Sequence, residues 1–220
     1  MGHFFIFRRY AGAITLLAGC FLLAGAGRLG APVWASIPPD PVPPAPDRYL
    51  SKAALARGKV LVASEKIKDD SFARTVILIT EYGWHGAAGI IINRPTKVLP
   101  ATALPYVKGL DKVDGTVWFG GPVDAGQITM LISSKEAPAA SVRVLADVYA
   151  STSIETLSAL LAGNGAGRFR LYAGYAGWAP QQLELEVARG GWYVTDAGAE
   201  EIFSEDTPGV CHRLMLRLGH

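Results

Sequence analysis

The apolar positions along the chain predict a domain that mixes strands with helices. Residues 75–80 and 87–92 are continuous apolar runs rich in β-branched side chains, which favours buried strands, and the Gly83–Gly86 turn between them predicts a hairpin. The expected strands are 59–63, 75–80, 87–92, 116–119, 127–133, 143–149, 168–172 and 192–195. With neighbouring strands antiparallel, the fold class is α+β, a single compact domain with a mixed, largely antiparallel sheet flanked by helices.

Helical spacing of apolar residues is clearest over 153–162. Ile154, Leu157 and the pair Leu160–Leu161 fall on one face of such a helix, and Ser151 or Ser153 can cap its start. A weaker helix is expected over 96–108, interrupted by its prolines, and two more over 200–203 and 210–218.

The stretch from Gly174 to Glu186 predicts a strand, a glycine-rich turn and a short helix. Gly174 and Gly177 permit backbone angles that other residues avoid, and Pro180 suits the first turn of a helix. Trp178 stands at this corner among small residues. Two readings stay open: Trp178 is a buried plug, or it lines a binding cleft with Tyr172 and Tyr175.

The N-terminal segment has the pattern of an export signal or membrane anchor over residues 1–35. Arg8 and Arg9 precede an uncharged run, residues 10–27. Cleavage after Ala35, lipidation at Cys20, retention as a membrane span and a start codon assigned too early all remain open. Residues 36–54 form a proline-rich linker, and the folded domain is expected over 55–220. Membrane contact through the N-terminal segment is therefore an expectation.

The charge balance and the motifs point away from several classes of function. The formal net charge of +2 lacks the basic excess on which most duplex DNA binding rests. No phosphate loop or nucleophile elbow is present, and no two histidines have the spacing of metal ligands. We therefore predict no catalytic residue, no cofactor and no metal site. Cys211 is expected to be buried and unreactive, and Glu184 and Glu186 to be solvated.

Five ordered motifs resemble the YqgE/AlgH family, an uncharacterised bacterial group also called UPF0301. They are GKVLVAS at 58–64, FARTV at 72–76, GAAGIIINRP at 86–95, FGGPV at 119–123, and the stretch 174–186 followed by Trp192. The resemblance covers about residues 55–218. It implies a compact α+β domain whose glycine motifs surround a shared groove, with no established catalytic residue. Family members are generally cytoplasmic, which is the alternative to export for this chain.

The function expected from these observations is a non-enzymatic binding or regulatory module with an unknown ligand or protein partner. The ligand-binding hypothesis rests on Asn93, Arg94, Gly120, Gly121, Tyr172, Tyr175 and Trp178. Asn93 and Arg94 could instead bond a neighbouring loop. One alternative is the transcriptional regulation attached to some family members. Another is an enzyme whose site assembles around Asn93-Arg94 and the loop Gly120-Gly121-Pro122.

Overall fold

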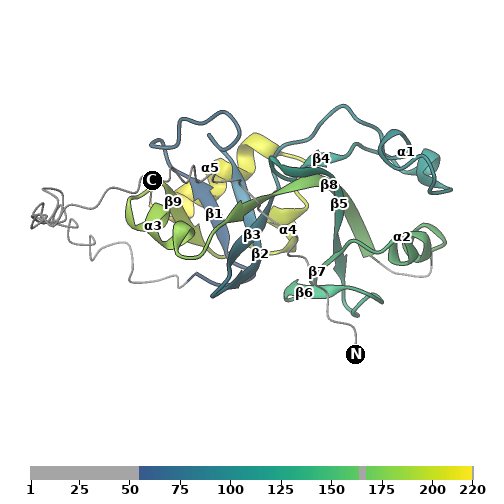
Figure 1. Ribbon diagram of the computed structural model, residues 1–220. Coiled ribbons are helices and arrows are strands. Elements are labelled where there is room, and N and C mark those ends of the chain that lie inside the picture. The colour runs from purple at the N-terminus through teal and green to yellow at the C-terminus, as the bar shows by residue number, and fades with distance from the viewer. Residues whose placement is uncertain (1–54, 164–166, 220) are drawn as a thin grey trace, which may run out of the picture. The chain divides into compact units, whose positions relative to one another are not determined.

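A single mixed sheet dominates the computed structural model, which describes residues 55–163 and 167–219 (Figure 1). Nine strands of this described part pair in the order β6-β7-β5-β8-β3-β2-β1-β9, and β4 lies beside β8. All of these pairs are antiparallel except β4–β8. The strands are β1 Val60–Ala63, β2 Val76–Gly83, β3 Gly86–Ile91, β4 Trp118–Phe119, β5 Val123–Ser134, β6 Val142–Leu145, β7 Val148–Ser151, β8 Gly167–Trp178 and β9 Trp192–Thr195. The α+β prediction is confirmed.

Helices cover both faces of this sheet and close three apolar clusters. They are α1 Pro100–Ala103, the 3-10 helix η2 Leu110–Lys112, α2 Ile154–Leu161, α3 Gln182–Ala188, α4 Ala199–Ile202 and α5 Thr207–Arg217. The first cluster lies between β1–β3 and the helices α4 and α5, and the second lies on the opposite face against α3. The third lies between β5, β8 and the segment of α1, η2 and α2.

Alternation along β1 and β2 explains why both faces of these strands are apolar. Val60 and Val62 point into the cluster under α4 and α5, whereas Leu61 points into the cluster under α3. Side chains of a strand alternate between its two faces, so a strand covered on both sides must be apolar at every position. Each of these three side chains is fully buried.

Strand β8 is the element that joins the two halves of the sheet, and here one prediction was wrong. We expected a glycine-rich turn after Tyr172, but the strand continues through Gly174 and Gly177 to Trp178. Its first half pairs with β5 and its last three residues pair with β3. Gly174 adopts a φ of 71°, and a Cβ there would stand 2.3 Å from the carbonyl oxygen of Gly121. The glycine permits close approach of a neighbouring chain segment and does not reverse the strand.

Two further elements differ from the sequence-based expectation. The range 143–149, predicted as one strand, is the hairpin β6–β7, whose two strands are separated at residues 146–147. The apolar alternation stays in phase across that short turn, so the sequence pattern conceals it. The helix predicted over 96–108 is reduced to α1 and η2. Pro105 disfavours helical angles at Leu104, which is the last residue to donate back into α1.

The other helices agree with the prediction in position, and two gain identified caps. The Ser153 side chain accepts from the backbone N–H of Thr156 at the start of α2. Asp206 accepts from Gly209 at the start of α5, which begins earlier than predicted. No helix within the described residues is long and apolar enough to cross a membrane. The predicted leader 1–35 and linker 36–54 lie wholly outside the described residues.

Candidate functional site

Four of the predicted ligand-binding residues meet where β4 runs beside β8. The N–H of Gly120 donates to Ala173 O at 2.8 Å, and its carbonyl accepts from Ile91 N at 2.9 Å. A Cβ on Gly121 would lie 2.1 Å from the carbonyl carbon of Tyr175. Tyr172 is fully buried beneath this seam. The glycines therefore let two backbones pack directly against each other, and their missing side chains leave no open space here.

Asn93 and Arg94 hold the loop that precedes β2. The Asn93 amide accepts from Val76 N at 2.9 Å and donates to Arg74 O at 3.0 Å. Arg94 Nη2 donates to Ala73 O at 2.9 Å. Arg74 has a φ of 59°, an uncommon angle for a residue with a side chain, so its loop depends on such tethers. Both side chains therefore bond a neighbouring loop, which was the alternative prediction to ligand binding.

Trp178 lies apart from the other predicted residues, in the cluster under α3. Its side chain is 7% exposed, and its ring packs edge-on against Trp192 with centroids 6.1 Å apart. Glu186 Oε2 accepts from both indole N–H groups, at 3.0 Å from Trp178 and 2.8 Å from Trp192. The expectation that Glu186 is solvated was wrong. Its carboxylate is half-buried because the two indoles and Gln182 surround it.

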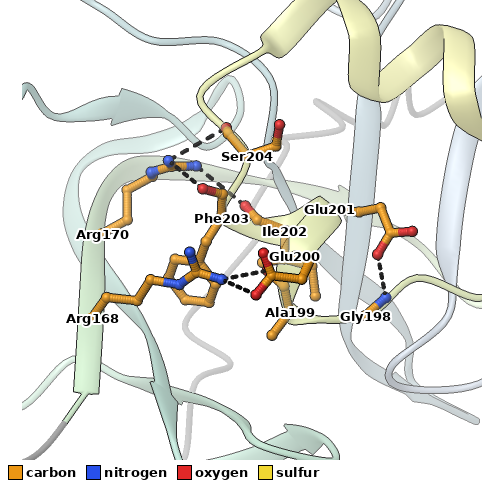
Figure 2. A network of polar contacts seen from close by, with 9 residues as sticks. All are labelled: Arg168, Arg170, Gly198, Ala199, Glu200, Glu201, Ile202, Phe203 and Ser204. Atoms are coloured by element: carbon orange, nitrogen blue, oxygen red, sulfur yellow. Dashed lines mark hydrogen bonds and ion pairs between the residues drawn. The ribbon is translucent and has the colours of Figure 1, made fainter.

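A buried arginine that the sequence did not single out joins β8 to the C-terminal helices (Figure 2). The Arg170 guanidinium donates to Ile202 O at 3.2 Å and to Phe203 O at 3.1 Å, and lies 3.7 Å from the centre of the Trp118 ring. It also pairs with the exposed carboxylate of Glu205. These carbonyls end α4, so the positive charge lies where a helix favours a cation.

The hydroxyl of Tyr172 is enclosed beside this arginine. It makes no hydrogen bond within the described part of the chain. Burial raises the pKa of the Tyr172 hydroxyl to about 12, and the Arg170 charge partly opposes that rise. The tyrosine is therefore neutral near pH 7. Its side chain packs within the core.

A polar hollow of about 460 Å³ lies next to this network. Its lining residues are Arg168, Glu200, Glu201, Phe203, Ser204, Glu205 and Arg213. Arg168 pairs with Glu200, as Figure 2 shows, while Arg213 pairs with Asp206 and Glu201 with Arg217. Because these pairs already satisfy the charges, the hollow presents no unbalanced group to a ligand.

A larger and more apolar groove of about 750 Å³ lies between α2 and the segment that joins α1 to η2. Its apolar lining includes Leu160, Leu161 and Phe169, and Tyr106 at its border is 70% exposed. Lys108 and Lys112 also line it, and none of the described residues in its wall carries a carboxylate. None of its lining residues is among the predicted ligand-binding residues.

Two further kinds of candidate group are a metal-binding cluster and a reactive thiol. No group of three or more His, Cys, Asp or Glu in the described ranges could hold a metal ion. Cys211 is half-buried, and burial raises the pKa of its thiol, so the reactive thiolate is a minor form near neutral pH.

Sequence comparison places this architecture among known bacterial proteins. A family model described as AlgH-like matches residues 60–220. A UPF0301 protein of Chlorobaculum tepidum is 34% identical over 155 residues, covering 69% of this chain and 81% of that protein. A UPF0301 protein of Methylococcus capsulatus is 34% identical over 165 residues, covering 74% of this chain and 91% of that protein.

Two solved structures share the fold. The solution structure of the AlgH protein from Pseudomonas aeruginosa matches with a TM-score of 0.65 and 29% identity, covering 74% of this chain and 89% of that one. The crystal structure of a Corynebacterium diphtheriae protein also matches with a TM-score of 0.65, covering 77% of this chain and 91% of that one. Because the second match has only 24% identity, it shows a shared fold and nothing more.

Proposed function

The chain belongs to the AlgH-like family, and from this premise we propose that it is a non-enzymatic binding module. The observation that carries the proposal is the apolar groove between α2 and the α1–η2 segment. A concave apolar surface with a few polar groups is the usual form of a binding site. The exposed Tyr106 at its border is a residue type that often anchors protein interfaces.

The charges of the groove favour one kind of occupant, a protein segment that carries apolar side chains and carboxylates. Lys108 and Lys112 are exposed at the groove and face no carboxylate from its own wall. Complementary charges increase the rate of encounter and select among partners. Val98 and Leu99, which precede α1, are also exposed apolar side chains, at 44% and 57%.

The enzyme alternative has less support in the same geometry. The side chains of Asn93 and Arg94 already form hydrogen bonds with the backbone of β2 and the loop before it. Gly120 and Gly121 are buried against β8. A reacting substrate would have to displace these contacts before reaching either loop.

Photo-crosslinking at Tyr106 tests the binding proposal. A photoreactive phenylalanine analogue replaces Tyr106 in the full chain, expressed in its native cells, and we expect one dominant adduct whose linked peptide is rich in carboxylates. Charge reversal by Lys108→Glu and Lys112→Glu should reduce that adduct about tenfold, because like charges then oppose docking.

The matched control places the same analogue at Leu216, which is 59% exposed on α5 and outside the groove wall. Equal yield of the same adduct at Leu216, or an adduct that is insensitive to the charge reversal, would exclude the groove as the docking site. Reconstitution of the captured partner with the purified chain then measures the affinity directly.

We also propose that the N-terminal segment directs export or attaches the chain to a membrane. Arg8 and Arg9, followed by the uncharged run 10–27, support this proposal, and cytoplasmic residence is the alternative. A fusion of residues 1–47 to a reporter that is active only outside the cytoplasm is expected to give activity. A well-expressed but inactive fusion would contradict it, and Arg8→Glu with Arg9→Glu serves as a matched control that should weaken export.

A further inference from the structure

The turn of the β2–β3 hairpin presents a tryptophan almost entirely to solvent. Trp84 is 83% exposed, whereas Trp118, Trp178 and Trp192 are each less than a tenth exposed. The imidazole of His85 lies against the indole with the two ring planes tilted by 34°, and Tyr82 at the base of the turn is 37% exposed. An indole so exposed at the end of a hairpin forfeits the burial that usually stabilises this side chain.

The same hairpin lies beside the point where the N-terminal chain joins the domain. Gly58 N donates to Ile79 O at 2.8 Å, which places residues 57–58 along β2. Burial raises the pKa of the Glu81 carboxyl on this strand, and the positive charge of Arg57 opposes that rise. Residues 57–58 of the domain therefore run beside the strand that leads into the turn with Trp84.

We propose that the hairpin turn 82–85 docks on the lipid bilayer, with Trp84 inserted at the membrane interface. This inference rests on the proposed membrane attachment of the N-terminal segment. Tryptophan favours that interface because its ring is apolar while its N–H can still bond water and headgroups. Tyr82 supports the base of the turn, since its hydroxyl donates to Glu184 at 2.7 Å.

With the linker as a tether, insertion of a single tryptophan is enough to dock the domain on the bilayer. Residues 36–54 are rich in proline, and such a spacer reaches at most about 60 Å when extended. The domain would therefore remain at a high effective concentration near the bilayer, where a weak contact is occupied. Because Arg57 and Glu81 have opposite charges, docking is expected on zwitterionic lipid and does not require anionic headgroups.

Fluorescence quenching in vesicles tests the proposal on the full chain. Trp34→Phe removes the indole of the leader, and the protein is mixed with phosphatidylcholine vesicles whose acyl chains carry bromine, a quencher that acts only at short range. We expect the emission to shift to the blue and to lose the share that Trp84 contributes. Adding Trp84→Phe should abolish that loss, because the three remaining described tryptophans are buried.

A matched control moves the reporter to Leu216, an exposed residue of α5, as Leu216→Trp in the background without Trp34 and Trp84. Its emission should remain unquenched. If the chain sediments with the vesicles but Trp84 is not quenched, the leader attaches and the hairpin proposal is wrong. If the chain does not sediment at all, the proposed attachment fails together with it. Equal quenching at residues 84 and 216 would also overturn docking through the hairpin.

Discussion

Replacing Trp178 by alanine is expected to lower the free energy of unfolding by about 3–5 kcal/mol. The ring is 7% exposed and packs against Trp192 and the buried Leu183 of α3. The buried side chains of its cluster, among them Ile79 and Val187, come from the sheet and from α3, which limits their movement into the space. The cavity would therefore remain largely open, which is the circumstance in which a large-to-small change costs most.

Chemical denaturation of the purified variant measures this loss, and Trp178→Phe is its matched control. Phenylalanine keeps most of the apolar volume but removes the N–H that donates to Glu186, so we expect a loss of about 1–2 kcal/mol. Glu186 would still accept from Trp192. If Trp178→Ala cost less than about 1 kcal/mol, the range of surface changes, the buried plug would be the wrong reading and the cleft would return as the hypothesis.

The parts of the fold that could be predicted are those set by local pattern. The β2–β3 hairpin follows from two β-branched runs around a glycine turn, and the start of α2 follows from the Ser153 cap. The course of β8 could not be predicted in the same way. Glycine at position 174 suits a turn as well as a close approach, and the residue that decides between them, Gly121, is distant in the sequence.

The candidate site was harder to predict, because its walls are far apart in the chain. Tyr106 and Lys108 belong to an irregular segment without helical or strand periodicity, and they form a groove only once α2 packs nearby. Arg170 shows the same limit in another form. The alternation of polar and apolar residues over 168–172 is typical of a half-buried strand, but α4 also covers the polar face and encloses the guanidinium of Arg170. A charged residue between two core positions, Leu171 and Phe169, was the available signal.

Replacing Arg170 by leucine is expected to lower the free energy of unfolding by about 2–4 kcal/mol. The change leaves the carbonyls of Ile202 and Phe203 without their donor in a buried place, and such groups are costly when unsatisfied. Part of the cost is offset by the apolar contact that leucine makes with Trp118. Glu205 loses its partner at little cost, because its side chain is 85% exposed and stays solvated.

Tyr172→Phe is the matched control for Arg170→Leu in urea denaturation. It removes a buried hydroxyl that has no hydrogen bond within the described residues, so stability should be unchanged or slightly higher. Arg170→Lys should fall between the two variants, since one ammonium cannot reach both carbonyls with the planar geometry of guanidinium. Hydrogen exchange should show faster opening of α4 and α5 in Arg170→Leu than in β1 and β2, because the lost bonds anchor those helices to β8. Uniform acceleration across the domain, or a loss below about 1 kcal/mol, would mean that Arg170 does not anchor the C-terminal helices.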